Sequence, residues 1–585
     1  MAPRFLVACA CMLLPAAASS PDRTVAYVLS PVLENGSLAA LNVAVSFNGN
    51  PSGTTILRWP IEWAGDKEVG RWARDIRVDG ATSVSEGPNG TRTIRSRPGA
   101  ALTVRYRIVS AFDRDPDVIN SRQSLPVIRP TWFYAVGEAV FAGIKDRDDA
   151  PATFAWTGAP PGFGFASDLE HLAGPGRAPL RPGTVGDVQE SIVIGGRDLR
   201  VSGNAQSGSG VRIATIGRFD FAQPAFAKLA EDVIASQRAF WGVRGRLPFL
   251  VAMTPLKPKL GSISFSGTGR SDAFALWVGE NSPLELLGYL LAHEYFHSWN
   301  PRQLGGLPDG DAQIAQYWFS EGFTDFYTRR LLVRAGLNSP QQFANAWNEA
   351  LAAYAISPFR TATNASAAKL FWTEPVAEKL PYQRGAMLAA IWDARLRRQS
   401  GGKLSLDDVL RKQRRDPRTR LRGDGAPEGK WSAATLFPQT AASFGLNVAA
   451  DIAKHVDAGA ALLLPADAFG PCAKVDTSTR RAFERGWDPD VTAAADSVVT
   501  GLDHASPAYA AGLRNGMKII ARDAGTPGDS RVAYVLRVDD KGTKRTLTFK
   551  PEGKTMTTVQ EVVLNAGLIK ARPDYCARTL SGLTS

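Results

Sequence analysis

Alternating apolar and polar positions dominate the first third of the chain. Residues 24–29 and 102–109 alternate with a period of two, the spacing that places every second side chain on one face of a β-strand. Asn-Gly pairs, which favour tight hairpin turns, separate such segments. The pattern predicts an N-terminal β-sandwich over residues 21–220, and we interpret the Gly-Phe-Gly-Phe string at 162–165 as a loop within it.

Farther along, apolar residues cover nearly the whole circumference of two predicted helices. The first should begin at Ser282 and Pro283, an N-cap residue followed by a proline at the first helical position, with Glu285 completing a capping box. It contains the string His-Glu-Tyr-Phe-His at 293–297, and the second contains Trp-Phe-Ser-Glu-Gly-Phe-Thr-Asp at 318–325. Helices that are apolar all round are buried. A buried helix seldom carries two histidines unless they bind something.

The spacing of the polar residues on these helices is typical of a catalytic zinc site. His293 and His297 are four residues apart, so their imidazoles project from one helical face, and Glu294 beside them can act as general base. Glu321 supplies a third ligand, which leaves one coordination position for water. Asp325 can accept the second N–H of a ligand histidine. The alternative is a buried helix and a solvated carboxylate pair without metal.

These strings resemble those of the glycyl aminopeptidase-type zinc metallopeptidases, which are gluzincins with a C-terminal PDZ domain. The resemblance continues in Leu-Pro-Tyr-Gln-Arg-Gly-Ala-Met at 380–387 and in residues 401–410, and it covers roughly residues 220–565. It implies a thermolysin-like catalytic domain that hydrolyses peptide bonds. One Zn²⁺ per chain would be held by His293, His297 and Glu321.

The resemblance also implies two catalytic residues. Glu294 would be the general base, and the phenol of Tyr382 would hydrogen-bond the oxyanion that develops on the substrate. Taken without the resemblance, Tyr382 is better interpreted as a core tyrosine that follows a loop proline.

One departure from the family concerns specificity. In these enzymes a Gly-rich strand before the metal helix carries a glutamate that grips the free amino group of the substrate. The corresponding stretch, 261–272, contains no glutamate. We expect it still to line the cleft, where Arg270 would bring a charge of the wrong sign for an ammonium group and Asp272 could replace the glutamate. The candidate substrate-binding residues are Ser266, Gly267, Thr268, Arg270 and Asp272.

The rest of the chain divides into further predicted units, so that the fold class is an α+β multidomain protein. Residues 501–517 resemble the core of a PDZ domain, although the expected carboxylate loop at 483–488 departs from the usual Gly-aromatic pattern and carries two acids. The module is therefore either a binder of peptide termini or a structural element. The predicted units after the sandwich are a catalytic domain (221–340), a helical domain that completes the active site (341–470), a PDZ-like domain (478–565) and a tail (566–585).

The N-terminus predicts export. Residues 1–20 have the charge, the short apolar run and the small residues of a secretory signal peptide, and no other stretch is long and apolar enough to span a membrane. Cys9 and Cys11 would leave with the signal. The remaining pair, Cys472 and Cys576, would form a disulfide in a periplasmic or secreted protein, the alternative being two free thiols.

The formal charge of +12 does not by itself indicate a nucleic-acid-binding function. Basic clusters at 395–398 and 411–415 are interpreted as solvated helix faces, because no nucleic-acid-binding motif accompanies them. We predict an exported zinc peptidase that acts on peptides or proteins, an aminopeptidase for small N-terminal residues. The alternatives are an endopeptidase or a peptidase of altered specificity, and a binding or chaperone-like protein on a peptidase scaffold. The sequence leaves the oligomeric state open.

Overall fold

The computed structural model describes residues 23–583, apart from 60–61, 64–65, 68, 117–123, 172–182, 204–209, 245–246, 258–264, 271, 309 and 422–425. The predicted signal peptide lies outside these residues. Among the described helices, none combines the length and the apolar character needed to cross a bilayer.

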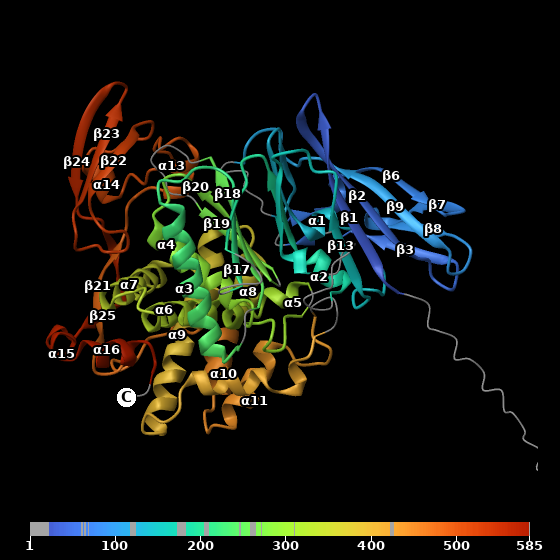
Figure 1. Cartoon of the computed structure of the whole chain (residues 1–585). Coiled ribbons are helices and arrows are strands. Elements are labelled where there is room, and N and C mark those ends of the chain that lie inside the picture. Colours follow the sequence, from blue (N-terminus) through green and yellow to red (C-terminus); the bar gives the residue numbers. More distant parts are fainter. Residues whose placement is uncertain are drawn as a thin grey trace, which may run out of the picture.

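Three sheets built from the first 200 residues occupy the right half of Figure 1. Their orders are β13-β1-β2-β9-β6, β12-β3-β8-β7 and β10-β11-β15-β14. Buried side chains from all three sheets form one core, so the arrangement is more elaborate than two stacked sheets. The strands are β1 (Val25–Glu34), β2 (Ser37–Asn48), β3 (Thr54–Arg58), β6 (Ala73–Asp79), β7 (Ser83–Glu86), β8 (Arg92–Arg95), β9 (Ala101–Ile108), β10 (Val127–Arg129), β11 (Trp132–Val136), β12 (Gly143–Ile144), β13 (Ala152–Trp156), β14 (Gly164–Ser167) and β15 (Ile192–Gly196).

One local expectation in this part is wrong. The Gly-Phe-Gly-Phe string is not wholly a loop, because its second half begins β14, which pairs with β15. Phe165 stacks on Trp156 with ring centroids 4.4 Å apart, and Phe163 packs on Phe133 at 6.4 Å. The packing of these two aromatic rings outweighs the flexibility of the neighbouring glycines.

A five-stranded sheet, in the order β16-β17-β18-β20-β19, packs against the helix that carries His293. β17, β18 and β20 run parallel and are buried almost throughout, whereas β19 is an antiparallel edge strand. The sheet takes in two strands from before residue 221, so the structural division lies earlier than the predicted boundary. Its strands are β16 (Arg200–Gly203), β17 (Val211–Thr215), β18 (Phe249–Leu256), β19 (Phe265–Gly269) and β20 (Ala273–Gly279).

Helices pack on this sheet and against one another in the centre and lower part of Figure 1. Helix α4, which carries His293, begins at Leu284, one residue later than predicted, because Pro283 has an extended backbone and occupies the N-cap position. Proline has no side-chain acceptor, so the capping box expected from Ser282 and Glu285 does not form. The main helices are α3 (Gln223–Trp241), α4 (Leu284–Phe296), α6 (Tyr317–Arg334), α7 (Pro340–Ile356), α8 (Asn364–Leu370), α9 (Pro375–Gln399), α10 (Leu406–Arg414) and α11 (Ala433–Ala442).

The C-terminal part combines a long two-stranded ribbon with a small sheet, at the left of Figure 1. The ribbon is anchored to the helices, because the side-chain amide of Asn348 on α7 bonds both the N–H (2.6 Å) and the carbonyl (3.1 Å) of Val562. The small sheet has a core of its own, built on Val499, Leu513, Tyr534 and Val538. The elements are β21 (Ala473–Phe483), α13 (Pro489–Ala494), α14 (Pro507–Ala510), β22 (Lys518–Ala524), β23 (Tyr534–Asp540), β24 (Thr543–Phe549) and β25 (Glu552–Leu564).

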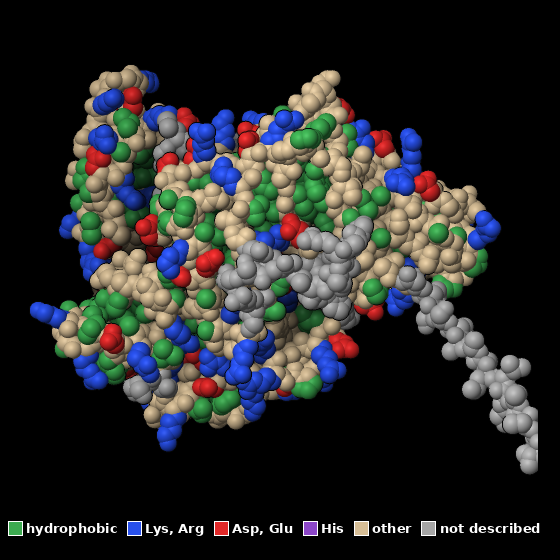
Figure 2. Space-filling view, in the orientation of Figure 1, with side chains coloured by type: hydrophobic (Ala, Val, Ile, Leu, Met, Phe, Trp, Pro, Cys, Tyr) green, Lys and Arg blue, Asp and Glu red, His purple; other side chains and the backbone are tan. Residues whose placement is uncertain are grey.

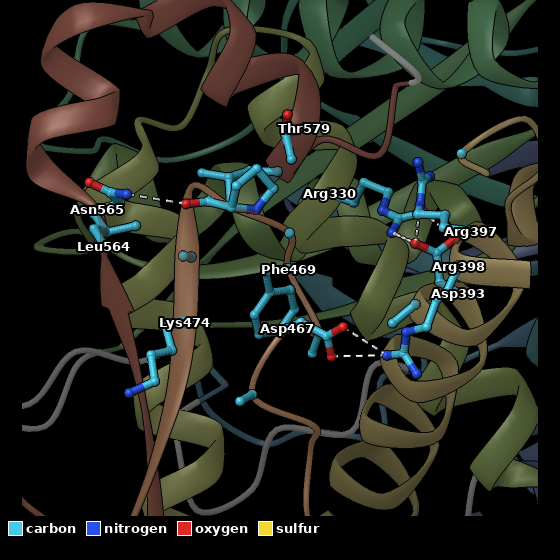
Figure 3. Close-up of a pocket in the computed structure, with 18 of the residues that line it drawn as sticks. Arg330, Asp393, Arg397, Arg398, Asp467, Phe469, Lys474, Leu564, Asn565 and Thr579 are labelled. Atoms are coloured by element: carbon cyan, nitrogen blue, oxygen red, sulfur yellow. Dashed lines mark hydrogen bonds and ion pairs between the residues drawn. The ribbon is translucent and has the colours of Figure 1, made fainter.

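Two short helices, α15 (Ala566–Ala571) and α16 (Pro573–Leu580), follow the ribbon. The structure pairs Cys472 with Cys576 in a disulfide that ties α16 to the start of β21. Beside it lies a cavity of about 920 Å³ (Figure 3). The charged groups at its edge are matched within the protein: Arg398 bonds both carboxylate oxygens of Asp467 at 2.9 Å, and Arg330 pairs with Asp393.

Basic side chains gather on the lower part of the face shown in Figure 2. Several of the arginines after residue 410 are held by the protein itself. Arg411 donates to the carbonyl of Phe240 (2.9 Å) and Arg414 to that of Trp241 (2.8 Å), both at the end of α3. These guanidinium groups connect α10 to α3.

Candidate metal and catalytic site

Two helices and the turn after the first bring three potential metal ligands together. His293 lies on α4, His297 caps its C-terminal end, and Glu321 lies in the second turn of α6. The Nε2 atoms of the two histidines are 3.2 Å apart, and they lie 3.2 and 3.3 Å from Oε2 of Glu321. The three sequence-predicted ligands therefore form one compact triangle of ligand atoms.

The hydrogen bonds of the other ring nitrogens determine which way the lone pairs point. Nδ1 of His297 lies 2.8 Å from the carbonyl of Asn300, which can only accept, so Nδ1 carries the proton. Nδ1 of His293 lies 3.0 Å from Oδ1 of Asp325 and likewise donates. In neutral imidazoles both Nε2 atoms then direct lone pairs at the carboxylate of Glu321. Three acceptors converge on one point, which is unfavourable unless positive charge lies between them.

The dimensions of the triangle fit a zinc ion. Ligands at about 2.0–2.1 Å in tetrahedral geometry are separated by about 3.4 Å, close to the observed distances. Burial lowers the pKa of His293, but its hydrogen bonds to Asp325 and Glu321 outweigh this and raise the pKa to about 10. The pKa of Glu321 is held well below its usual value, against the effect of burial, by the two histidines. The site thus favours a positive charge, whether a proton or a cation.

The carboxylate of Asp325 is itself held by several groups. Besides His293, the hydroxyl of Tyr289 donates to Oδ1 at 3.0 Å, and the guanidinium of Arg329 donates to Oδ2 at 3.1 Å. Burial would raise the pKa of Asp325, but Arg329 and the hydrogen bond from His293 keep it well below the usual range. Asp325 is therefore an ionised acceptor for the histidine.

Tyr382 approaches the same histidine from α9. Its ring lies 5.9 Å from that of His293, centroid to centroid, and nearly parallel to it. The preceding Pro381 is inside the helix and not in a loop. Burial, and to a smaller extent the negative charge of the nearby Glu321, raises the pKa of Tyr382 well above 10. The hydroxyl of Tyr382 therefore stays protonated and can donate a hydrogen bond.

The edge strand β19 passes close to the proposed base. A Cβ added at Gly269 would lie 3.6 Å from Oε2 of Glu294, so the end of the strand faces this carboxylate. Ser266, Gly267 and Thr268 are on the same strand. The end of β19 therefore lies beside Glu294. Because successive strand residues point to opposite faces, Gly267 shares the face of Gly269, whereas Ser266 and Thr268 lie on the other face, opposite Trp277 and Ala275 of β20.

Arg270 and Asp272 also differ from the expectation. Arg270 does not offer an unmatched positive charge, because it is 4% exposed and its guanidinium lies 3.4 Å from the carboxylate of Glu138. Asp272 lines a different cavity, of about 480 Å³, together with Tyr295 and Trp299. Tyr295 projects from nearly the opposite side of α4 to His293, because residues two positions apart on a helix are rotated by about 200°. The geometry does not favour Asp272 as a replacement for the missing glutamate.

Several residues of this site are not apparent from the motifs. The side-chain amide of Asn300 donates to the carbonyls of Phe319 (3.2 Å) and Ser320 (2.9 Å), which fixes the turn that orients His297 against the start of α6. Arg329 and Glu138 were also missed. Asn300 and Arg329 are polar residues within apolar stretches of the sequence. This pattern is the sequence feature that could have indicated them. Glu138 lies on the short helix α1 (Gly137–Val140) in the N-terminal part, and nothing in the sequence connects it with Arg270.

The comparison with known families agrees with this geometry. Residues 287–384, which cover most of α4 and all of α6 and end two residues after Tyr382, match the profile of the M61 glycyl aminopeptidase family. This chain resembles the M61 peptidases. The resemblance predicted from the motifs is thereby confirmed, and it supports peptidase activity. No curated protein matches the sequence of the chain.

Solved structures show the likeness at the level of the fold. An aminopeptidase N family protein from Idiomarina loihiensis aligns with 96% of this chain and 100% of its own, with a TM-score of 0.67 and 17% identity. At that identity the match establishes a shared mixed α/β multidomain fold. An M1 zinc metallopeptidase from Deinococcus radiodurans aligns with 76% of this chain and 95% of its own, at 15% identity and a TM-score of 0.45, from which we draw no conclusion.

Proposed function

We propose that the protein is an exported zinc-dependent peptidase. The observation that carries this proposal is the convergence of two Nε2 lone pairs and one carboxylate oxygen at tetrahedral spacing, with the Tyr382 ring beside them. A zinc ion held by His293, His297 and Glu321 would polarise the scissile carbonyl and acidify the attacking water.

The remaining chemistry belongs to side chains of this protein. Glu294 accepts the proton of the attacking water and passes it to the leaving amine, the role of a general base that then acts as acid. Tyr382 donates a hydrogen bond to the oxyanion of the tetrahedral intermediate. The backbone of β19, at the edge of its sheet, is available to align an extended substrate.

Aminopeptidase specificity is a finer proposal. The M61 resemblance favours cleavage next to a free amino group, yet β19 carries no carboxylate and Asp272 lines another cavity. We therefore propose an aminopeptidase for small N-terminal residues with weakened selection for the amino group. The alternative is an endopeptidase or a peptidase of altered specificity.

The predicted export, unit boundaries and PDZ-like module are part of the same proposal. The small sheet with its own core between residues 499 and 549 is consistent with a PDZ-like domain. The ribbon strand β25, which follows this sheet, is anchored to α7 through Asn348, and this supports a structural role or a role in substrate access.

A peptide library, offered both free and N-acetylated, tests the function. Wild-type protein with bound zinc should cleave it, with cleavage sites read by mass spectrometry, and chelation should abolish cleavage. A protein that binds zinc but cleaves nothing would instead favour a binding or chaperone-like role on a peptidase scaffold.

A further inference from the structure

Arg329 lies outside the ligand set, yet it is bonded to the group that orients one ligand. One of its guanidinium nitrogens donates both to Oδ2 of Asp325 (3.1 Å) and to the backbone carbonyl of the same residue (2.9 Å). The other carboxylate oxygen, Oδ1, receives the Nδ1–H of His293 and the hydroxyl of Tyr289. The carboxylate is thus fixed by donors on both oxygens.

The guanidinium is itself held in place. Its central carbon lies 5.5 Å from the ring centroid of Tyr289 and 5.2 Å from that of Trp347, so it sits against two aromatic rings. Arg329 is 6% exposed and Trp347 is 1% exposed. A cation in such surroundings has little freedom to move and is screened weakly by solvent.

The positive charge of the Arg329 guanidinium stabilises the carboxylate of Asp325, in addition to fixing its position. Asp325 is removed from most solvent, and a buried carboxylate that has only neutral donors is an uncompensated charge, which is unfavourable. Arg329, one helical turn later on α6, supplies the compensation. Because Tyr289 belongs to α4 and Arg329 to α6, the network also ties the helix of His293 to the helix of Glu321.

We propose that Arg329 is a positioning residue, which holds His293 in its ligand orientation through the carboxylate of Asp325. The inference rests on the proposed zinc site. Without Arg329, Asp325 loses its countercharge and one of the two anchors of its carboxylate, and the imidazole of His293 is free to rotate away from Glu321. A variant that lacks Arg329 should therefore bind zinc more weakly, while its affinity for substrate should change little.

The decisive variant is Arg329→Met, which keeps the apolar stem and removes the cation and its donors. Loss of such outer partners typically weakens metal binding by about 10–100-fold. We expect that loss in the zinc dissociation constant, measured on metal-free protein by competition with a chromogenic chelator. At saturating zinc, kcat should fall while KM stays close to the wild-type value.

Arg330→Met is a matched control. Arg330 is the next residue of the same helix, is 7% exposed and pairs with Asp393 and Asp407, away from the metal ligands. It should lower thermal stability with little effect on zinc affinity. Arg329→Lys, which retains the charge and loses the planar fork, should recover part of the affinity. If Arg329→Met does not fold, Arg329→Gln takes its place, since its amide can still reach Asp325 without a charge.

The outcomes separate the two proposals. A folded Arg329→Met or Arg329→Gln variant that binds zinc as tightly as wild type would overturn the positioning role. A wild-type protein that binds zinc but cleaves no peptide would overturn the peptidase function and leave the comparison of zinc affinities valid. The absorption spectrum of the cobalt-substituted protein gives a second readout, because a displaced His293 changes the ligand geometry.

Discussion

Gly322 and Gly385 meet where α6 crosses α9. A Cβ at Gly322 would lie 2.3 Å from Cα of Gly385, and a Cβ at Gly385 would lie 1.7 Å from the carbonyl oxygen of Trp318. No other residue type fits either position without moving a helix. Gly322 follows the ligand Glu321, and Gly385 comes three residues after Tyr382. The close approach therefore sets the distance between the proposed ligand Glu321 and the phenol of Tyr382.

Gly385→Ala should separate the two helices and displace Tyr382. Overpacking of this kind costs about 1–3 kcal/mol, and we expect a lower melting temperature together with a reduced kcat at unchanged zinc content. Gly429→Ala is the control, because a Cβ there would meet nothing within 4 Å. If Gly385→Ala lowers stability and leaves kcat intact, the crossing does not position the tyrosine.

Glu294→Gln should retain zinc and lose turnover. The ligand triangle does not include this side chain, so the metal content should remain near one per chain. Loss of a general base lowers kcat by about 10²–10⁴-fold. Near-normal turnover in this variant would remove Glu294 from the mechanism.

Tyr382→Phe should reduce kcat by about 10²–10³-fold with little change in KM, because the hydroxyl contacts the oxyanion mainly in the transition state. The ring that packs on His293 is preserved, so zinc affinity should not change. An unchanged kcat with a raised KM would show that the hydroxyl serves only to bind substrate.

N-acetylation of a good peptide substrate should lower kcat/KM by less than about a hundredfold, under about 3 kcal/mol. No carboxylate of β19 is present to neutralise an ammonium group, and Asp272 lines a different cavity. The measurement compares matched free and blocked peptides. A blocked peptide that is essentially inert, together with a severe loss in Asp272→Ala, would return the protein to strict aminopeptidase specificity.

Asp168 should make the protein less stable as the pH rises through neutrality. Burial, opposed by a hydrogen bond from the N–H of Ile192, raises the pKa of this carboxyl to about 7, above its ordinary value of 3.8. The folded state therefore binds more protons than the unfolded state between these pH values, and stability falls as Asp168 ionises. The full effect is about 4 kcal/mol at most.

Thermal unfolding at pH 5 and pH 8 measures this effect. Asp168→Asn, which keeps an acceptor for Ile192, should show a smaller loss of stability between the two pH values than wild type. Equal pH dependence in the two proteins would show that the carboxyl titrates normally in the folded state.

Much of the site could be predicted from the chain alone. A separation of four residues puts His293 and His297 on one helical face whatever surrounds them. Glu321 could be predicted as a carboxylate on the second buried helix, and the family resemblance supplied Tyr382. The period-two pattern likewise predicted strands in the N-terminal third. These are local properties, because helix and strand periodicity act over a few residues.

The tertiary structure decided which partners these residues meet. The pairing of Arg270 with Glu138, the support of His293 by Arg329 through Asp325, and the crossing at Gly322 and Gly385 all depend on how separate elements pack. The same holds for Asp272, whose short distance in sequence from β19 did not place it in the cleft. Side-chain direction and helix separation are set by close packing over the whole core, so local sequence determined the chemistry that is available and packing determined where it acts.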